Sequence, residues 1–178
     1  EGNEEYLQFL KEVTGEATIV TSKIAAPFIS AVFKKIGANT VNVIGTNKDI
    51  ACLMTREDFE SIDLSNVKDS VIIPGRSFVH DKVVEDIFSR DGVERVVGRG
   101  PDTLSVDGEL SSGMTDEEVI MEEIESFRDL IDAINFFGMR KVWFFLVLLL
   151  IFSILLLFLS FFNILFLYYY FILNEYFI

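Results

Sequence analysis

Polar residues that could bind a ligand are concentrated in three short segments, each following an apolar run. The richest segment, residues 74–81, contains Pro74, Gly75, Arg76, Ser77 and His80. It precedes a stretch with a helical pattern, and the first amides of a helix attract anions. The imidazole of His80 lies next to Asp81 in sequence, so it could be oriented for acid–base chemistry. A lone histidine is also commonly structural, and both interpretations of His80 stay open.

Two further segments have the composition of ligand-binding loops. Residues 45–49 begin Gly45, Thr46 and Asn47, and residues 98–102 include Arg99 and Gly100. A glycine lets a ligand approach the backbone, while hydroxyl and amide groups offer hydrogen bonds. Ordinary turns have the same composition, so this alternative stays open for both segments. Residues 45–49 are not a Walker motif, which needs two glycines at fixed spacing and Lys before Ser or Thr.

Few other residues suggest chemistry. The single cysteine, Cys52, lies in an apolar run typical of a buried small residue. One cysteine and one histidine exclude a disulfide framework, a thiolate zinc site and an iron–sulfur cluster held by this chain alone. Neither a Ser–His–Asp spacing nor a glycine-rich dinucleotide fingerprint is present. The residues alone therefore predict a binding module, with a small enzyme using His80 and Asp81 as an alternative.

These segments must be positioned by alternating strands and helices. β-branched runs predict strands over residues 16–21, 40–44, 50–54, 70–73 and 93–97. Apolar spacing and caps predict helices over residues 3–13, 22–35, 56–61, 81–88 and 115–137. Residues 103–110 resemble a hairpin around Asp107-Gly108. We expect an α/β domain with a small mixed sheet, at least partly parallel, and flanking helices.

Composition limits the function classes further. The 178 residues carry 15 basic and 28 acidic side chains, a net charge of −13. An acidic chain repels phosphate, which excludes a nucleic-acid binder that works by charge. A chain that is 51% hydrophobic can bury enough surface to fold.

The C-terminal part differs sharply from the rest. Residues 142–173 contain no charged side chain, and a helix needs about 20 apolar residues to cross a bilayer. Arg140 and Lys141 precede this stretch and would hold that side in the cytoplasm. The 142–178 segment nevertheless lacks the Gly and Ala that membrane helices use, and A/T-rich triplets encode its abundant Leu, Phe, Ile, Tyr and Asn. Residues 139–178 are therefore either a membrane anchor or a read-through of A/T-rich DNA.

The start of the chain suggests a piece of a longer protein. Residue 1 is Glu rather than Met, and no positively charged leader precedes an apolar run. We therefore expect a cytoplasmic domain, membrane-anchored if residues 142–173 are a genuine span.

Three strings that include these segments, residues 42–50, 71–81 and 99–109, carry a resemblance to a known family. They are similar to the C-terminal region of the methanogenesis marker ten family, radical SAM enzymes of methanogens that methylate an arginine of methyl-coenzyme M reductase. The resemblance covers residues 1–138, where the family's chain ends, which favours the read-through interpretation of the tail.

The resemblance implies a cobalamin-binding domain, with methylcobalamin as the methyl donor. It places the 4Fe-4S cluster and S-adenosylmethionine in an N-terminal radical SAM domain, which this chain lacks, since its only cysteine is Cys52. The usual cobalamin signature, Asp-x-His-x-x-Gly, is also absent around His80, so histidine ligation of cobalt is in doubt. We expect the corrin contacts in the three segments, at Gly45, Thr46, Asn47, Pro74, Gly75, Arg76, Ser77, His80, Arg99 and Gly100. The alternative is a membrane-anchored ligand-binding or interaction domain without catalysis.

Overall fold

The protein is an α/β domain followed by one long apolar helix, as the sequence predicts. The structure, a computed structural model, describes residues 13–102, 104 and 116–176. The chain divides into two compact units, Glu1–Met139 and Arg140–Ile178. The predicted helix over residues 3–13 falls almost entirely outside the described residues, as does most of the predicted hairpin over residues 103–110.

The first unit is built on a sheet of four strands, β1 (Ala17–Thr21), β2 (Val41–Gly45), β3 (Ser70–Ile73) and β4 (Val96–Arg99). Their order across the sheet is β2-β1-β3-β4, and each neighbouring pair is parallel. The predicted mixed sheet is therefore parallel in all its described strands. All four carboxyl ends lie at one edge of the sheet, which we call the carboxyl edge.

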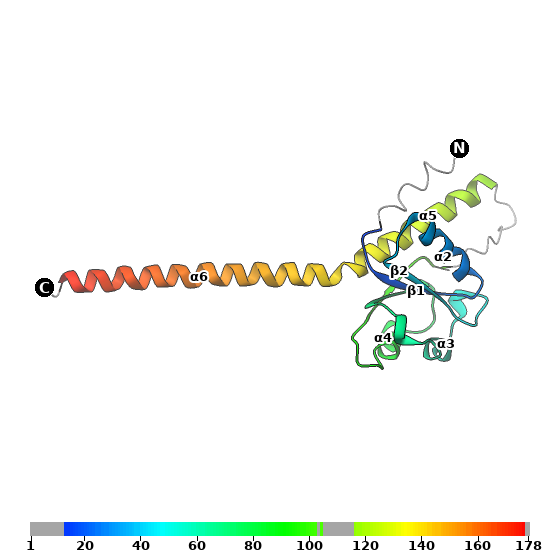
Figure 1. Ribbon diagram of the computed structural model, residues 1–178, viewed down its shortest axis with the longest axis horizontal. Helices are drawn as coiled ribbons and strands as arrows, with labels where there is room; N and C mark the ends of the chain where they lie inside the picture. Colours follow the sequence, from blue (N-terminus) through cyan, green and yellow to red (C-terminus); the bar gives the residue numbers. More distant parts are fainter. Residues whose placement is uncertain (1–12, 103, 105–115, 177–178) are drawn as a thin grey trace. The chain divides into compact units, whose positions relative to one another are not determined.

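Helices cover both faces of this sheet (Figure 1). On one face, α2 (Ala25–Ile36) and α5 (Asp116–Gly138) pack on Ala17, Ile19 and Ile72. On the other face, α3 (Arg56–Glu60) and α4 (Asp81–Phe88) pack on Val20, Val71 and Ile73. Burial on both faces explains why these strands are continuously apolar rather than alternating.

Local signals explain where the helices begin and end. α2 starts at Ala25, three residues later than predicted, because the Ser22 hydroxyl accepts a hydrogen bond from the Ala25 amide (3.0 Å). Gly37 ends α2 in a left-handed conformation (φ 77°), which glycine adopts without steric cost. Thr55 caps α3 as predicted, and its amide donates to the Asp58 carboxylate (2.7 Å).

The structure corrects two strand predictions. Residues 50–54 are not a strand: Ala51–Leu53 form a 3₁₀ turn, η2, which directs Ala51 and Met54 into the core. Cys52, within this turn, is half-buried rather than fully buried. β4 begins at Val96 and extends through Arg99, whereas a strand over residues 93–97 was predicted. The delay follows from Arg95, whose buried side chain turns inward to pair with Asp91.

A second short 3₁₀ turn, η3 (Leu64–Asn66), leads into β3. The α5 helix approaches β4 closely: a Cβ on Gly98 would lie 2.3 Å from the ring of Phe137. The Ser70 hydroxyl donates to the Phe137 carbonyl nearby (3.0 Å). Gly98 and Ser70 therefore fix α5 against the sheet.

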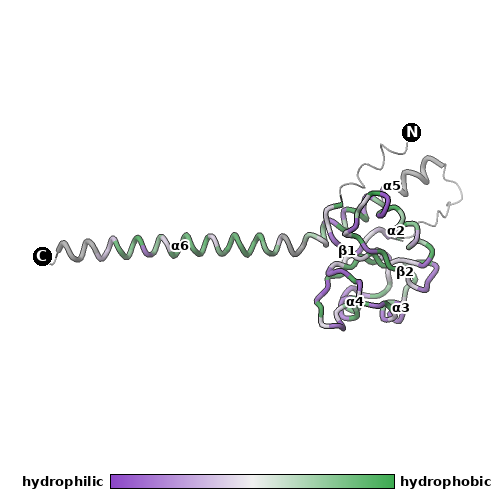
Figure 2. Tube along the Cα trace, in the orientation of Figure 1, coloured by the Kyte–Doolittle hydropathy of each residue, from purple (hydrophilic) through white to green (hydrophobic). Residues whose placement is uncertain are grey.

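The second unit consists of one continuous helix, α6 (Arg140–Tyr176). Its described part is coloured hydrophobic over most of its length in Figure 2. Its described apolar side chains are all exposed, from Trp143 to Tyr170.

Candidate functional site

The strand order defines where a ligand would bind. The chain leaves β1 for β2 on one side and then crosses to β3 on the other, so the order reverses between β1 and β3. In open parallel sheets ligands bind outside the carboxyl ends of the strands at such a switch point. All three predicted segments lie at this carboxyl edge.

On one side of the switch point, the loops after β1 and β2 are joined. The Thr46 amide donates to the Thr21 carbonyl (2.9 Å), and the Lys23 amide donates to the Lys48 carbonyl (2.9 Å). An exposed ion pair between Lys23 and Asp49 (2.8 Å) also links the two loops. The loop over residues 45–49 is therefore held by the β1 loop.

The predicted residues of this loop differ in what they can offer a ligand. A Cβ on Gly45 would lie 2.9 Å from Cβ of Ala26, so the protein's own packing already requires glycine there. Thr46 is buried, and its hydroxyl accepts weakly from the Lys48 amide (3.4 Å). Asn47 is exposed, so its side chain is the one that the loop presents to solvent.

On the other side of the switch point, the loops after β3 and β4 are joined in the same way. The Gly75 amide donates to the Pro101 carbonyl (2.8 Å) and the Arg76 amide to the Asp102 carbonyl (2.9 Å). Arg76 and Asp102 also form an exposed ion pair (2.9 Å). The structure thus brings residues 74–77 together with residues 99–102, and residues 45–47 together with the β1 loop.

Arg99 holds the 74–81 segment rather than presenting a free cation. Its guanidinium donates to the carbonyls of Gly75 (2.7 Å), Ser77 (2.9 Å) and Val79 (3.1 Å). Its Nε donates to the Asp81 carboxylate (2.8 Å). Because these acceptors use the guanidinium's donors, Arg99 organises the loop and is not available to an anion.

Ser77 is the unusual residue of this loop. It is 7% exposed, and its Oγ is a buried polar atom without a hydrogen-bond partner among the described residues. Leaving a buried hydroxyl unpaired costs about 1–3 kcal/mol. A bound ligand that accepts a hydrogen bond from this hydroxyl would explain why the hydroxyl is buried there.

His80 and Asp81 do not form an oriented pair. The Nδ1 of His80 accepts a hydrogen bond from the Lys82 amide (3.2 Å) and so caps α4, while Asp81 binds Arg99. This arrangement uses the histidine as a helix cap. It gives no geometric support to the alternative of an enzyme built on these two residues.

Sequence reasoning missed part of the carboxyl edge. At the end of β1, the buried hydroxyl of Thr21 donates to the Leu104 carbonyl (2.6 Å), which places the chain after β4 beside the switch point. Leu104 adopts a left-handed conformation (φ 48°) that is strained for a branched residue. No local pattern marks this contact, because Thr21 and Leu104 are far apart in sequence.

The carboxyl edge also exposes large apolar side chains. Phe78, between Ser77 and Val79, is 83% exposed, and Ile24 after β1 is 53% exposed. Ile50, in the loop after β2, is 43% exposed. Each of these residues lies next to a joined loop pair, so this edge combines apolar groups with ion pairs.

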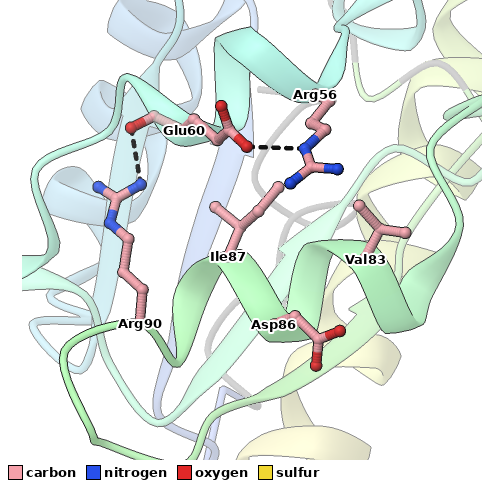
Figure 3. Close-up of a pocket in the computed structure, with 6 residues that line it drawn as sticks. All are labelled: Arg56, Glu60, Val83, Asp86, Ile87 and Arg90. Atoms are coloured by element: carbon pink, nitrogen blue, oxygen red, sulfur yellow. Dashed lines mark hydrogen bonds and ion pairs between the residues drawn. The ribbon is translucent and has the colours of Figure 1, made fainter.

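The described residues line two open cavities of about 410 Å³ each. One cavity lies between the carboxyl edge and α5. It is lined by residues 100–102 of the loop after β4 and by Glu125, Ser126 and Asp129 of α5. The other lies between α3 and α4 over a floor of Val83 and Ile87 (Figure 3).

The α3–α4 cavity has little unpaired charge. Figure 3 shows Arg56 bound to the Glu60 carboxylate (2.7 Å) and Arg90 bound to the Glu60 carbonyl (2.7 Å). The hydrogen bond to Glu60 raises the pKa of Arg56 above its usual value. None of the predicted site residues lines this cavity.

Within the described residues, no group of three or more His, Cys, Asp or Glu side chains is placed to hold a metal ion. One helical stretch, Glu125–Tyr170, contains a window long and apolar enough to cross a membrane, with mean hydropathy 3.2 and none of it buried.

Comparison with known protein families finds none that matches this chain. Comparison with curated proteins also finds no match.

Proposed function

We propose that the α/β unit holds a cobalamin at its carboxyl edge and serves a radical SAM methyltransferase that acts on an arginine of methyl-coenzyme M reductase. The observation that carries this proposal is the strand order β2-β1-β3-β4, whose switch point is flanked by the predicted segments. The resemblance of residues 42–50, 71–81 and 99–109 to the methanogenesis marker ten family supplies the cofactor and the substrate.

The residues at this edge suit the body of a corrin. A corrin has apolar faces and a periphery of amide side chains, which donate and accept hydrogen bonds. The exposed side chains of Ile24, Ile50 and Phe78 match the apolar part. The Ser77 hydroxyl, which has no partner within the part of the chain that the structure describes, and the exposed Asn47 side chain match the amide periphery.

The structure uses His80 as a helix cap, since its Nδ1 accepts from the Lys82 amide at the start of α4. We therefore assign to the described loops the binding and orientation of the corrin, not its cobalt chemistry. Bound methylcobalamin would supply the methyl group, and the cluster and S-adenosylmethionine would belong to a separate radical domain.

The proposal is tested by titrating the full chain, purified in detergent, with hydroxocobalamin. We expect a shift of the corrin absorption bands and co-elution of one corrin per chain on gel filtration. The test variant is Arg76→Ala/Asp102→Ala, which removes the exposed ion pair between the β3 and β4 loops. Its corrin retention should fall below that of the matched control Arg56→Ala. This control removes an exposed ion pair with Glu60 at the α3–α4 cavity. A folded chain that leaves the corrin free would overturn the proposal.

A second candidate is favoured by α6, a helix of 37 residues in which residues 142–173 carry no charged side chain. We infer from it a membrane-anchored ligand-binding domain without catalysis, with the α/β unit in the cytoplasm. Mass spectrometry of chymotryptic peptides from the native membrane fraction distinguishes the two interpretations of the tail. Peptides from residues 142–173 would support the anchor, whereas a native chain that ends near Gly138 would support read-through.

A further inference from the structure

Phe78 is the most exposed large apolar side chain among the described residues of the α/β unit. Phe78 is 83% exposed, whereas Phe33, Phe59 and Phe88 are at most 2% exposed. A single exposed apolar side chain is common on protein surfaces, but Phe78 differs because the loop that carries it is held by Arg99. We propose that Phe78 is the aromatic anchor of the carboxyl-edge site and packs against the face of the bound corrin, an inference that rests on the proposed function.

The backbone on both sides of Phe78 is fixed. The carbonyls of Ser77 (2.9 Å) and Val79 (3.1 Å) both accept from the Arg99 guanidinium, which is itself held by Asp81. The ring therefore stands on a loop that is already ordered, and little conformational entropy is lost when a ligand binds it. Arg99 acts here as a positioning residue for Phe78.

The same geometry presents hydrogen-bond donors beside the ring. In a trans peptide the N–H points opposite to the preceding carbonyl, and the described chain has no cis peptide bond. Since the carbonyls of residues 77 and 79 point toward Arg99, the amides of Phe78 and His80 point away from it. Neither amide has a backbone acceptor among the described residues. A ligand with an apolar face and peripheral carbonyl groups, such as a corrin, meets both features.

The neighbouring residues support an occupant of this size. Ile24 and Ile50 lie beyond the carboxyl ends of β1 and β2, on the other side of the switch point, and are also exposed. Apolar contacts from both sides suit a broad, flat ligand that spans the switch point.

The experiment compares three single variants of the full chain in detergent by hydroxocobalamin titration. Phe78→Ala should weaken corrin binding by about tenfold or more, because it removes a stacked ring from the contact. Phe78→Trp keeps an aromatic face and should bind within about threefold of the unchanged chain. Phe136→Ala, which removes a 73% exposed ring on α5 near the amino ends of the strands, should leave binding unchanged.

The outcomes separate this inference from the proposed function. If the unchanged chain retains corrin and Phe78→Ala retains it equally, the inference on Phe78 is wrong and the proposed function stands. Equal losses in Phe78→Ala and Phe136→Ala would also overturn it. If the unchanged, folded chain retains no corrin, the proposed function fails and the role of Phe78 fails with it. Urea unfolding of each variant confirms that a loss of binding is not a loss of fold.

Discussion

Ser77 illustrates how a single residue can report on a ligand. Its buried hydroxyl has no partner among the described residues, so in the free protein it contributes an unfavourable term. Replacing it with alanine should leave the unfolding free energy unchanged or raise it by about 1 kcal/mol. The same replacement should weaken corrin retention, because the ligand loses a hydrogen bond.

Pulse proteolysis in urea measures the stability change of Ser77→Ala, and hydroxocobalamin titration measures the binding. Ser65→Ala is a matched control, since the Ser65 hydroxyl is exposed and bonded to Asp63 (2.9 Å). A large loss of stability in Ser77→Ala would show that the hydroxyl has a structural partner instead.

Arg95 and Asp91 give the second prediction at this scale. The buried Arg95 guanidinium donates to both carboxylate oxygens of Asp91 (2.7 and 2.9 Å) and to the Phe88 carbonyl. The hydrogen bonds from Arg95 lower the pKa of Asp91 from 3.8 to about 2. A lowered carboxyl pKa stabilises the fold fully above the unfolded value, and this contribution is lost as the pH falls through the folded value.

The urea midpoint of the unchanged chain should therefore exceed that of Asp91→Asn by a constant amount above about pH 4. The difference should shrink between pH 3.8 and about pH 2, as the carboxylate of Asp91 becomes protonated. Asp86→Asn is the control, because Asp86 is exposed and its ion pair with Lys82 is long (3.4 Å). If the difference in urea midpoint between the unchanged chain and Asp91→Asn stays constant over this pH range, the ion pair with Arg95 does not lower the pKa of Asp91.

At the scale of elements, Gly98 determines how closely α5 approaches β4. A Cβ there would lie 2.3 Å from the Phe137 ring, so Gly98→Ala must displace that ring or the helix. We expect a loss of about 1–3 kcal/mol in the unfolding free energy, as for other overpacked cores.

A double-mutant cycle tests whether Phe137 is the cause. The variant Gly98→Ala/Phe137→Leu should be more stable than the sum of the two single changes predicts, because the smaller side chain leaves room for the added methyl group. Additive effects would show that the clash with Phe137 is not what limits this position.

Elements were more predictable from sequence than contacts between them. β-branched runs located β1, β2 and β3, and Gly37 correctly marked the end of α2. The apolar run over residues 50–54 was misleading, because a short apolar run is compatible with a strand or with a turn that faces the core.

The candidate site shows the limit more clearly. The sequence predicts that Arg99 lies in a ligand-binding loop, because it follows an apolar run. In the structure its side chain instead binds three backbone carbonyls and Asp81. Those acceptors lie 18 to 24 residues away in sequence, where no local pattern reports them. The exposure of Phe78 likewise depends on the tertiary path of its loop.

For the whole molecule, the main question is whether the α/β unit depends on α6. Both apolar cores are formed by residues up to Phe137, and the described apolar side chains of α6 are exposed. A chain that ends at Met139 should therefore keep its urea midpoint and remain soluble without detergent, aided by its strongly acidic charge.

Sedimentation after detergent removal and pulse proteolysis in urea test this truncation, with the full chain in detergent as the reference. We expect the truncated chain in the supernatant and the full chain in the pellet or in added vesicles, since about 20 apolar residues suffice to span a bilayer. An unfolded or insoluble truncated chain would show that the two units are not independent. If the truncated chain is folded, membrane binding of the full chain is a property of α6 alone. Corrin retention by the shorter chain then measures the carboxyl edge without any contribution from the helix.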